Sequence, residues 1–309
     1  MKGTKYNARL EAALERKPVL VMAHRGVSCA NIVDNTVESF DAAIRQGADI
    51  VEADVCETLD GDLFVLHDGM EPVVLGQEES IVNMRTEDVR KLRYINHNHL
   101  RIDHPVNTLD EVLEHLKGRC IVNIDRGWNS WDKIFRAVLR HGMADQILFK
   151  SPPEEKYLRQ MAEQREPFLY MPVAWFPEEV ELVETYDLNM VAVEVFGYRE
   201  DAPIMSEAFL SRMKERGVAR LVSALTLADP VMPSVTDRWR QAGGQGRRNM
   251  ANAIMDRRIL LAGGHDDDTS VLGNADQGWG WLVERGFNIL QTDWTLDMNL
   301  YLKARGYIS

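Results

Sequence analysis

The stretch GADIVEADVCETLDGDLFVLHD, residues 47–68, combines two β-strand patterns with regularly spaced acidic side chains. Residues 48–55 form a short apolar run. A turn-forming Asp-Gly pair then leads into a second run at 63–68, which is a hairpin signal. Glu52 and Asp54 are two positions apart, so both side chains point to the same side of a strand. The stretch therefore predicts a strand that carries two carboxylates on one face.

The rest of the chain alternates short β-like runs with amphipathic segments. Eight runs precede helical patterns, and no change in composition separates them. Eight βα units predict an α/β fold, a single TIM (β/α)8 barrel over residues 1–309, with a doubly wound sheet as the alternative. The run at 63–68 falls outside this count and extends the second unit. The eight runs end near His24, Asp54, Asp125, Lys150, Trp175, Phe196, Ala224 and Asp293.

Residues 226–278, which follow the seventh run, are longer than one loop and one helix require. In a barrel this segment leaves the carboxyl end of a strand, where active sites lie, so we expect a lid or specificity element. It contains a basic helical pattern over 247–258. It also contains four consecutive polar residues at 265–268, His-Asp-Asp-Asp, which we interpret as a solvated loop because consecutive side chains cannot all converge on one ion.

The composition is that of an ordinary globular protein, with 45% apolar and 27% charged residues. A net charge of −12 argues against a protein that grips nucleic acid or an anionic membrane. The chain shows no apolar signal-peptide core and no run long enough to span a membrane. Its three cysteines are too scattered for a disulfide framework, so we expect a cytoplasmic protein.

Ionisable side chains gather at the predicted carboxyl ends of the first four units. Glu52, Asp54 and Asp125 would form an all-oxygen site for a hard cation such as Mg²⁺ or Ca²⁺. Without a metal, three clustered carboxylates would repel each other and raise each other's pKa. The sequence therefore predicts a divalent metal site at one mouth of the barrel.

The same strand ends carry two imidazoles and two cations. His24 and His67 suit paired proton transfer near neutral pH. Arg25 and Lys150 would neutralise a phosphate as charge develops on it. Together with the metal site, these groups indicate metal-assisted cleavage of a phosphodiester. Glu194, on the sixth run, is interpreted either as a substrate-binding residue or as a polar residue of the barrel core.

The motifs resemble those of the glycerophosphodiester phosphodiesterases. That family has a strand ending in HRG, then PENT, then GAD-x-x-E-x-D-V-x-x-T-x-D-G, then HD, with TL-x-E-x-L, an acid-bearing third strand and a closing TD-x-P further on. The corresponding stretches here are HRG (24–26), DNT (34–36), GADIVEADVCETLDG (47–61), HD (67–68), NTLDEVL (107–113), VNID (122–125) and QTDW (291–294).

The resemblance implies a TIM barrel with a small insert after the second strand, here about residues 69–105. It implies one divalent cation, Mg²⁺ or Ca²⁺ with Mn²⁺ as an alternative, bound by Glu52, Asp54 and Asp125. It also implies hydrolysis of phosphodiesters such as glycerophosphodiesters to an alcohol and a phosphomonoester, in some cases through a cyclic phosphate. By position, His24 and His67 would be base and acid, and Arg25 would bind phosphate.

The chain departs from the family at several points. Val33 and Asp34 replace the proline and glutamate that precede Asn-Thr, and Asp125 replaces a glutamate. Gly127 stands where the family has a lysine, for which Lys150 on the next strand could compensate. The seventh run lacks the family's Trp and Asn.

The departures motivate alternatives to a plain glycerophosphodiesterase. One is hydrolysis of a sugar-containing phosphodiester, such as an agrocinopine-like opine. A second is a non-catalytic barrel that binds a phosphorylated ligand, and a third is a metal-enolate lyase, which would leave the HRG and HD motifs unexplained. The sequence leaves open the alcohol, the metal and the oligomeric state.

Overall fold

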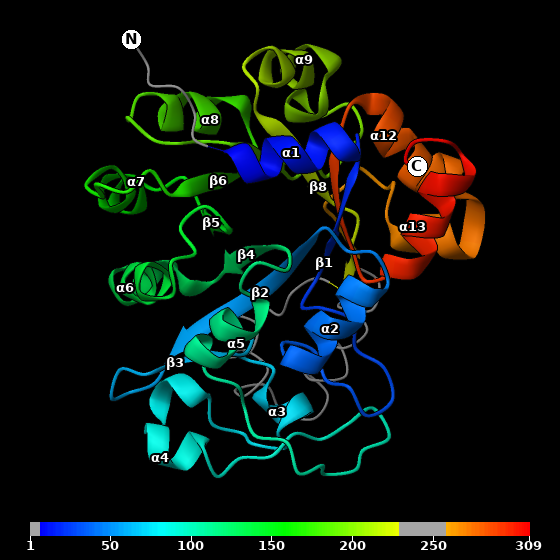
Figure 1. Ribbon diagram of the computed structural model, residues 1–309. Coiled ribbons are helices and arrows are strands. Elements are labelled where there is room, and N and C mark those ends of the chain that lie inside the picture. Colours follow the sequence, from blue (N-terminus) through cyan, green and yellow to red (C-terminus); the bar gives the residue numbers. More distant parts are fainter. Residues whose placement is uncertain (1–6, 229–257) are drawn as a thin grey trace, which may run out of the picture.

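The computed structural model describes residues 7–228 and 258–309, and within them eight parallel strands close into a barrel (Figure 1). Their order is β1-β11-β8-β7-β6-β5-β4-β2, and pairing between β1 and β2 completes the ring. This confirms the predicted TIM barrel and excludes the doubly wound sheet. The strands are β1 (Leu20–Ala23), β2 (Ile50–Glu57), β4 (Ile121–Asp125), β5 (Ile147–Ser151), β6 (Leu169–Ala174), β7 (Ala192–Val195), β8 (Ala219–Ser223) and β11 (Ile289–Thr292).

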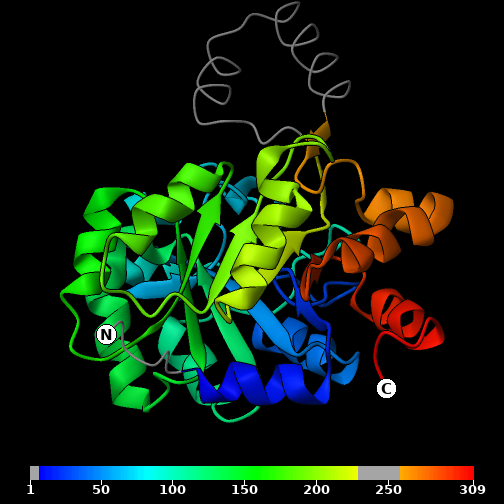
Figure 2. The same cartoon turned by 90° about the horizontal axis from the view of Figure 1, so that it is seen from above.

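Helices surround the strands as an outer layer (Figure 2). Several begin where the sequence predicts. Thr108 caps one of them by accepting a hydrogen bond from the Glu111 N–H, and the Glu111 side chain accepts one from the Thr108 N–H. The helices around the barrel are α1 (Ala8–Arg16), α2 (Val37–Arg45), α5 (Leu109–Leu116), α6 (Trp131–His141), α7 (Glu155–Ala162), α8 (Pro177–Glu184), α9 (Glu207–Glu215), the short α12 (Trp281–Arg285) and α13 (Thr295–Ala304).

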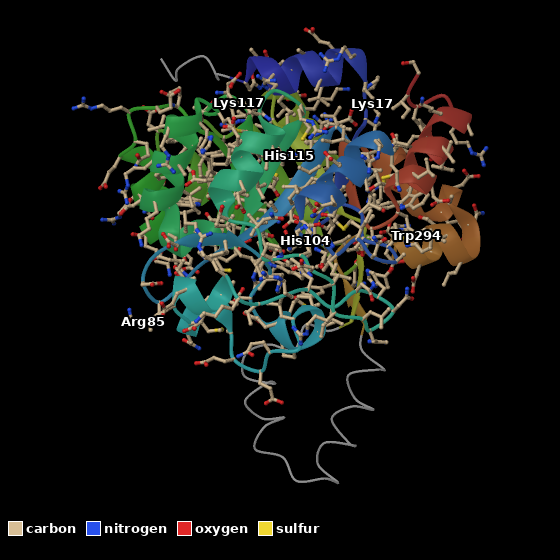
Figure 3. All side chains as sticks on the ribbon, turned by 60° about the horizontal axis from the view of Figure 1, so that its bottom comes forward. Lys17, Arg85, His104, His115, Lys117 and Trp294 are labelled. Atoms are coloured by element: carbon tan, nitrogen blue, oxygen red, sulfur yellow. The ribbon has the colours of Figure 1, made fainter. Side chains whose placement is uncertain are left out.

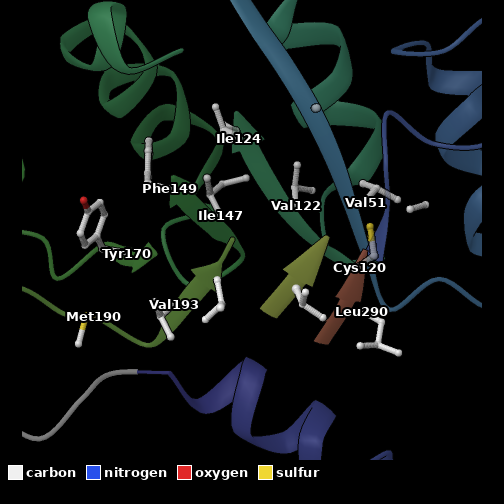
Figure 4. Packing of buried hydrophobic residues seen from close by; sticks show 14 of the residues in the cluster. Val51, Cys120, Val122, Ile124, Ile147, Phe149, Tyr170, Met190, Val193 and Leu290 are labelled. Atoms are coloured by element: carbon white, nitrogen blue, oxygen red, sulfur yellow. The ribbon is translucent and has the colours of Figure 1, made fainter. Parts of the chain in front are cut away.

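The two sides of the barrel strands have different roles. Alternate residues such as Val51, Val122 and Phe149 pack outward against the helices (Figure 4). The residues between them face the barrel interior, where a separate apolar cluster fills the amino-terminal half. That cluster includes Leu20, Met22, Ile50, Ile121, Leu148, Leu169, Met171, Ala192, Ala219, Leu221 and Ile289.

The interior positions change from apolar to polar toward the carboxyl ends of the strands. On β2 the alternating positions after Ile50 are Glu52 and Asp54, and on β4 the last of these positions is Asp125. The apolar amino-terminal half of the barrel interior contributes to stability, and the polar carboxyl-terminal half forms a mouth lined by ionisable groups.

The chain between β2 and α5 forms a small insert at the edge of the barrel. β2 pairs antiparallel with β3 (Leu63–Val65), which confirms the predicted hairpin, and α3 (Glu71–Val74), η1 (Ile81–Asn83) and α4 (Thr86–Val89) follow. In Figure 3, Arg85 lies at the outer rim of this insert and His104 nearer the barrel. The insert has its own core, made of Val33, Cys56, Phe64, Leu66, Val74, Leu75, Ile81, Val89, Tyr94 and Val106.

The second insertion begins with β9 (Thr226–Ala228), which pairs antiparallel with β10 (Arg258–Leu260). Residues 229–257, with most of the predicted basic helix, lie outside the described residues. The lid over 226–278 therefore stays a prediction, as do the single-domain organisation over 1–309 and the insert limits of 69–105. The short helices η2 (Gly127–Ser130), η3 (Pro203–Met205), η4 (Thr269–Asn274) and η5 (Asp276–Gly280) complete the fold.

The polar run at 265–268 differs from the solvated loop expected of it. Asp266 and Asp267 are only 3% and 2% exposed; Asp267 accepts a hydrogen bond from Thr292 of β11, and Asp266 accepts one from the Thr269 N–H. Hydrogen bonds from outside the run compensate their burial, which four consecutive polar letters could not reveal. Within the described ranges, 7–228 and 258–309, no helix is both long and apolar enough to cross a membrane.

Candidate active site

Three carboxylates meet at the carboxyl end of the barrel. Glu52 and Asp54 lie on β2, and Asp54 pairs in register with Asp125 at the end of β4. One oxygen from each of the three lies within 4.8 Å of the others. The structure thus brings together the three residues predicted as metal ligands, two of them buried and one half-buried.

The electrostatics of this cluster fit a bound cation. Burial raises the pKa of Glu52 well above its usual range, and the charge of Asp54 raises it further. Burial also acts to raise the pKa of Asp54, but Arg25, His67 and the hydrogen bond from Asn35 outweigh it and lower the pKa. It costs free energy to keep two adjacent buried carboxylates both charged, because the charges repel each other and are poorly solvated. A divalent ion on an all-oxygen donor set would relieve that cost.

The turn after β1 is held in an unusual backbone conformation. Arg25 and Gly26 have φ angles of +55° and +79°. A Cβ on Gly26 would lie 2.4 Å from Oγ of Ser39, so only glycine fits against the start of α2. The Arg25 N–H then donates to Oε2 of Glu52 at 2.8 Å. Gly26 therefore fixes the backbone that supports the metal-site carboxylate.

The Arg25 side chain lies among carboxylates. Its Nε is 3.0 Å from Oδ2 of Asp54, and its Nη1 is 3.7 Å from Oδ2 of Asp34. Asn35 exchanges two hydrogen bonds of 3.0 Å with Asp54, one from its side-chain amide and one to its oxygen. Burial raises the pKa of Asp34, which Arg25 opposes. Val33, which stands where the family has a proline, packs in the core of the insert.

His24 is paired with an acid from the last strand. Its Nδ1 lies 2.9 Å from Oδ1 of Asp293. Burial alone lowers the pKa of His24, but the hydrogen bond and charge of Asp293, with the charge of Glu52, raise it overall. Asp293 in turn is held by Asp267, whose Oδ2 accepts the Asp293 N–H at 3.0 Å. Among the described residues, Nε2 of His24 has no hydrogen-bond partner.

His67 lies in a different environment. Its Nδ1 lies 2.9 Å from the carbonyl oxygen of Asp68, to which it donates. Burial lowers the pKa of His67, and the nearby charge of Asp54 only partly opposes this. Arg126, with a φ of +58°, reaches back to the same loop and places its Nε 2.9 Å from Oδ1 of Asp68.

Lys150 lies deeper than a simple phosphate ligand would. Its Nζ is 2.6 Å from Oδ2 of Asp125 and 3.1 Å from Oε2 of Glu194. Burial tends to lower its pKa, yet these carboxylates raise it above the usual range. Glu194 is completely buried and accepts a hydrogen bond from Ser223, which favours the barrel-core alternative for this residue.

Several residues of the site were not assigned a role from the sequence. Asn35 and Asp293 lie inside the motifs DNT and QTDW, so the motifs contained the signal without revealing the partner. Arg126 directly follows Asp125. Because Gly127 stands where the family has a lysine, the neighbouring Arg126 could have been considered as a replacement for that cation. No sequence pattern indicated that Asp267 would contact the site.

Two sequence models match separate parts of the chain. A sequence model described as "Glycerophosphoryl diester phosphodiesterase family" matches residues 24–147, and one described as "Domain of unknown function" matches residues 231–302. The chain is 40% identical over 73 residues to a glycerophosphodiester phosphodiesterase from Caldanaerobacter subterraneus subsp. tengcongensis. That match spans 24% of this chain and 30% of the relative's length.

Solved structures match along most of the chain. A glycerophosphoryl diester phosphodiesterase from Parabacteroides distasonis has a TM-score of 0.67 at 12% identity, over 93% of this chain and 87% of the other. A phosphodiesterase from Oleispira antarctica has a TM-score of 0.60 at 15% identity, over 92% and 96%. These likenesses concern the fold, whereas the motif-bearing segment carries the sequence match. The chain is similar to the glycerophosphoryl diester phosphodiesterase family over residues 24–147, and it matches the first of its curated relatives over less than a third of that relative's length.

Proposed function

We propose that the protein is a metal-dependent phosphodiesterase that hydrolyses a glycerophosphodiester-type substrate to an alcohol and a phosphomonoester. The observation that carries this proposal is the cluster of Glu52, Asp54 and Asp125, with oxygens within 4.8 Å, flanked by two histidines and Arg25. The family match over residues 24–147 supports the same reaction class. The Oleispira antarctica structure contains the product sn-glycerol-3-phosphate, the kind of phosphomonoester expected here.

Glu52, Asp54 and Asp125 would hold the cation, which we propose to be Mg²⁺ or Ca²⁺, with Mn²⁺ as an alternative. When bound, it would supply positive charge that stabilises the phosphate oxygens as negative charge develops on them. Arg25 would bind the same phosphate as a second positive group, since its guanidinium already lies beside the acidic cluster. Lys150 would hold Asp125 in place, and Glu194 would hold Lys150.

The two histidines would move the protons. In the metal-free chain the pKa of His24 is raised and that of His67 is lowered. Because a bound cation would offset the Glu52 charge that contributes to the raised pKa of His24, we keep the order implied by the family resemblance, with His24 as base and His67 as acid. In a two-step reaction through a cyclic phosphate, each histidine would take both roles in turn.

The decisive test is an assay that measures phosphomonoester release from glycerophosphoethanolamine and glycerophosphocholine, with the protein stripped of metal and then supplied with Mg²⁺, Mn²⁺ or Ca²⁺. We expect activity that depends on the cation. His24→Ala and His67→Ala should each lower kcat by roughly 10²–10⁴-fold. His97→Ala, on an exposed loop, is the matched control and should retain full activity.

If the wild type turns over no diester, glycerol- or sugar-based, with any of the three metals, the proposal is wrong. Tight binding of a phosphomonoester without turnover would then favour the non-catalytic alternative. Full activity in either histidine variant would remove that residue from the mechanism. The cytoplasmic location and the oligomeric state stay outside this test.

A further inference from the structure

One peptide group in the turn after β3 contacts the ring of His67 on one side and a buried carboxylate on the other. The Asp68 carbonyl oxygen lies 2.9 Å from Nδ1 of His67. Because a carbonyl oxygen can only accept a hydrogen bond, Nδ1 carries the proton, and Nε2 is left for the substrate. The N–H of the same peptide, that of Gly69, donates to Oε2 of Glu71 at 2.6 Å. The Asp68–Gly69 peptide therefore connects the imidazole to the carboxylate.

Glu71 is buried at the start of α3, where it is only 1% exposed. Its Oε1 accepts hydrogen bonds from Oγ of Ser80 and from the Ile81 N–H, at 2.6 and 2.9 Å. Ile81 and Val74 are themselves buried in the core of the insert. Within the described parts of the chain, no cationic side chain pairs with Glu71, so hydrogen bonds from neutral donors hold its carboxylate. Glu71 thus attaches the peptide beside His67 to the core of the insert.

Other contacts fix the same turn. The Leu66 N–H donates to the Asp54 carbonyl at 3.0 Å, which joins the chain before the turn to β2. Nε of Arg126 lies 2.9 Å from Oδ1 of Asp68. Gly69 has a φ angle of +93°, a conformation that favours glycine, and it turns the chain back toward the insert. The turn is therefore held from β2, from the end of β4 and from the insert.

The arrangement acts on His67 in two ways. Because its N–H is bonded to a carboxylate, the Asp68–Gly69 peptide is restrained from rotating, and its carbonyl stays directed at Nδ1 of the ring. A charge-assisted hydrogen bond at the N–H also polarises the peptide, which makes the carbonyl a stronger acceptor. A stronger acceptor at Nδ1 fixes the ring orientation and favours the protonated ring.

We infer that Glu71 is the positioning residue for His67 and acts on it through the Asp68–Gly69 peptide. Glu71 sets the tautomer of the ring and favours the protonated form that the proposed acid needs. Asp293 contacts Nδ1 of His24 directly, so each histidine has a carboxylate on its Nδ1 side, one in contact and one across a peptide. The inference rests on the proposed phosphodiesterase function and adds a residue to it.

Several charged groups besides Glu71 face His67. Burial lowers the pKa of His67 most, and the charges around the ring act in both directions. Glu71→Gln leaves all of these groups in place, so its effect is separable from theirs. They are the carboxylates of Asp34, Asp54 and Asp68 and the cations of Arg25 and Arg126.

The test is an NMR measurement of the ring nitrogens of His67 in the wild type and in Glu71→Gln, both with Mg²⁺ added, with His67→Ala to identify the resonances. In the wild type the neutral ring should carry its proton on Nδ1. Glu71→Gln removes the charge and, in either amide orientation, at least one of the three hydrogen bonds. The ring pKa should then fall by about 0.5–1 unit, and more of the neutral ring should carry its proton on Nε2.

Steady-state kinetics with glycerophosphoethanolamine give a second readout. In Glu71→Gln, kcat should fall by roughly 10- to 100-fold with little change in KM, because a reacting group is misplaced. The limb of the pH–rate profile that His67 sets should move to lower pH. Ser80→Ala removes a donor from Oε1 and leaves the Gly69 contact, so it should lower Tm without moving the tautomer or the limb. Glu78→Gln, an exposed acid of the same insert, should change none of these quantities.

An unchanged His67 tautomer and pKa in Glu71→Gln, or equal shifts in Ser80→Ala, would overturn the inference and leave the phosphodiesterase proposal standing. If the wild type hydrolyses no diester, the proposed function fails by itself, and the NMR comparison still decides whether Glu71 acts on the ring.

If Glu71→Gln does not fold, the wild type alone decides. A neutral His67 with its proton on Nδ1, together with a Gly69 amide protected from hydrogen exchange, supports the inference. A proton on Nε2, or a Gly69 amide that exchanges as fast as an unbonded one, overturns it.

Discussion

Nδ1 of His24 and Oδ1 of Asp293 lie 2.9 Å apart and join the tips of the first and last strands of the barrel. The two residues are 269 positions apart in the chain, so only closure of the ring brings them together. The pair fixes the tautomer of His24 with its proton on Nδ1, which leaves Nε2 for the substrate. Asp293 is thus a positioning residue for the proposed acid–base chemistry.

Asp293→Asn tests this role. The amide keeps the shape but loses the charge, so kcat should fall by roughly 10²–10⁴-fold. Because Asp293 contributes to the raised pKa of His24, the limb of the pH–rate profile that His24 sets should move to lower pH. Asp297→Asn, an exposed acid on α13, is the control and should leave the profile unchanged. An unshifted limb in Asp293→Asn would show that this carboxylate does not tune His24.

Asp267 holds the Asp293 side of this pair in place through a hydrogen bond. Its Oδ1 accepts from Nε1 of Trp279 and Oγ1 of Thr292, both at 2.8 Å, and its Oδ2 accepts the Asp293 N–H. In Asp267→Asn, either amide orientation faces at least one of these donors with an N–H.

We therefore expect Asp267→Asn to lose about 1–3 kcal/mol of unfolding free energy and to lower kcat together with it. Urea denaturation and steady-state kinetics measure the two effects. Trp279→Phe removes one donor and leaves the Asp293 contact, so its loss of kcat should be smaller. If Trp279→Phe impairs kcat more than Asp267→Asn does, Asp267 does not act through Asp293.

Local patterns predicted the local structure well. The spacing of Glu52 and Asp54 determined which side of β2 carries carboxylates, because side chains alternate along any strand. The hairpin and the Thr108 cap are likewise decided by a few neighbouring residues. The barrel itself followed from eight repeated units, since parallel strands joined by helices have few ways to bury both faces.

Long-range partners were not predictable in this way. The contact between Asp267 and Asp293 depends on how the second insertion packs on β11, which no periodicity encodes. For the same reason the solvated-loop interpretation of 265–268 was wrong. Glu194 illustrates a related limit: alternation places it in the interior, but it does not reveal the contact with Lys150 that favours a core ion pair over a substrate ligand.

Variants of the Lys150–Glu194 pair can separate the structural role of Lys150 from its catalytic role. Lys150→Met would leave Glu194 buried without its cation, so we expect a loss of about 3–5 kcal/mol in unfolding free energy. Adding Glu194→Leu should restore much of that stability, because the uncompensated charge is gone. Activity should stay low in the double variant, since Asp125 still lacks its partner. Recovery of both stability and kcat would limit Lys150 to a structural role.

The raised pKa of Glu52 leads to a prediction about metal-free protein. Glutamate ionises near pH 4.3 in an unfolded chain, whereas in the folded chain burial and Asp54 delay its ionisation. As pH rises above about 4.3, unfolding therefore releases a proton, and the metal-free fold loses stability until Glu52 is ionised. Glu52→Gln should abolish that loss.

Thermal unfolding in EDTA and in excess Mg²⁺ or Ca²⁺, from pH 5 to pH 9, measures this effect. For the wild type, the gain in Tm on adding metal should grow with pH, because deprotonated carboxylates bind the cation. For Glu52→Gln, the metal-free Tm should be higher than that of the wild type at alkaline pH, and the gain from metal should be small. Glu57→Gln, at the end of the same strand and paired with Lys133, controls for loss of a carboxylate outside the cluster. A wild-type gain in Tm that is independent of pH would contradict both the raised pKa and the assignment of Glu52 as a ligand.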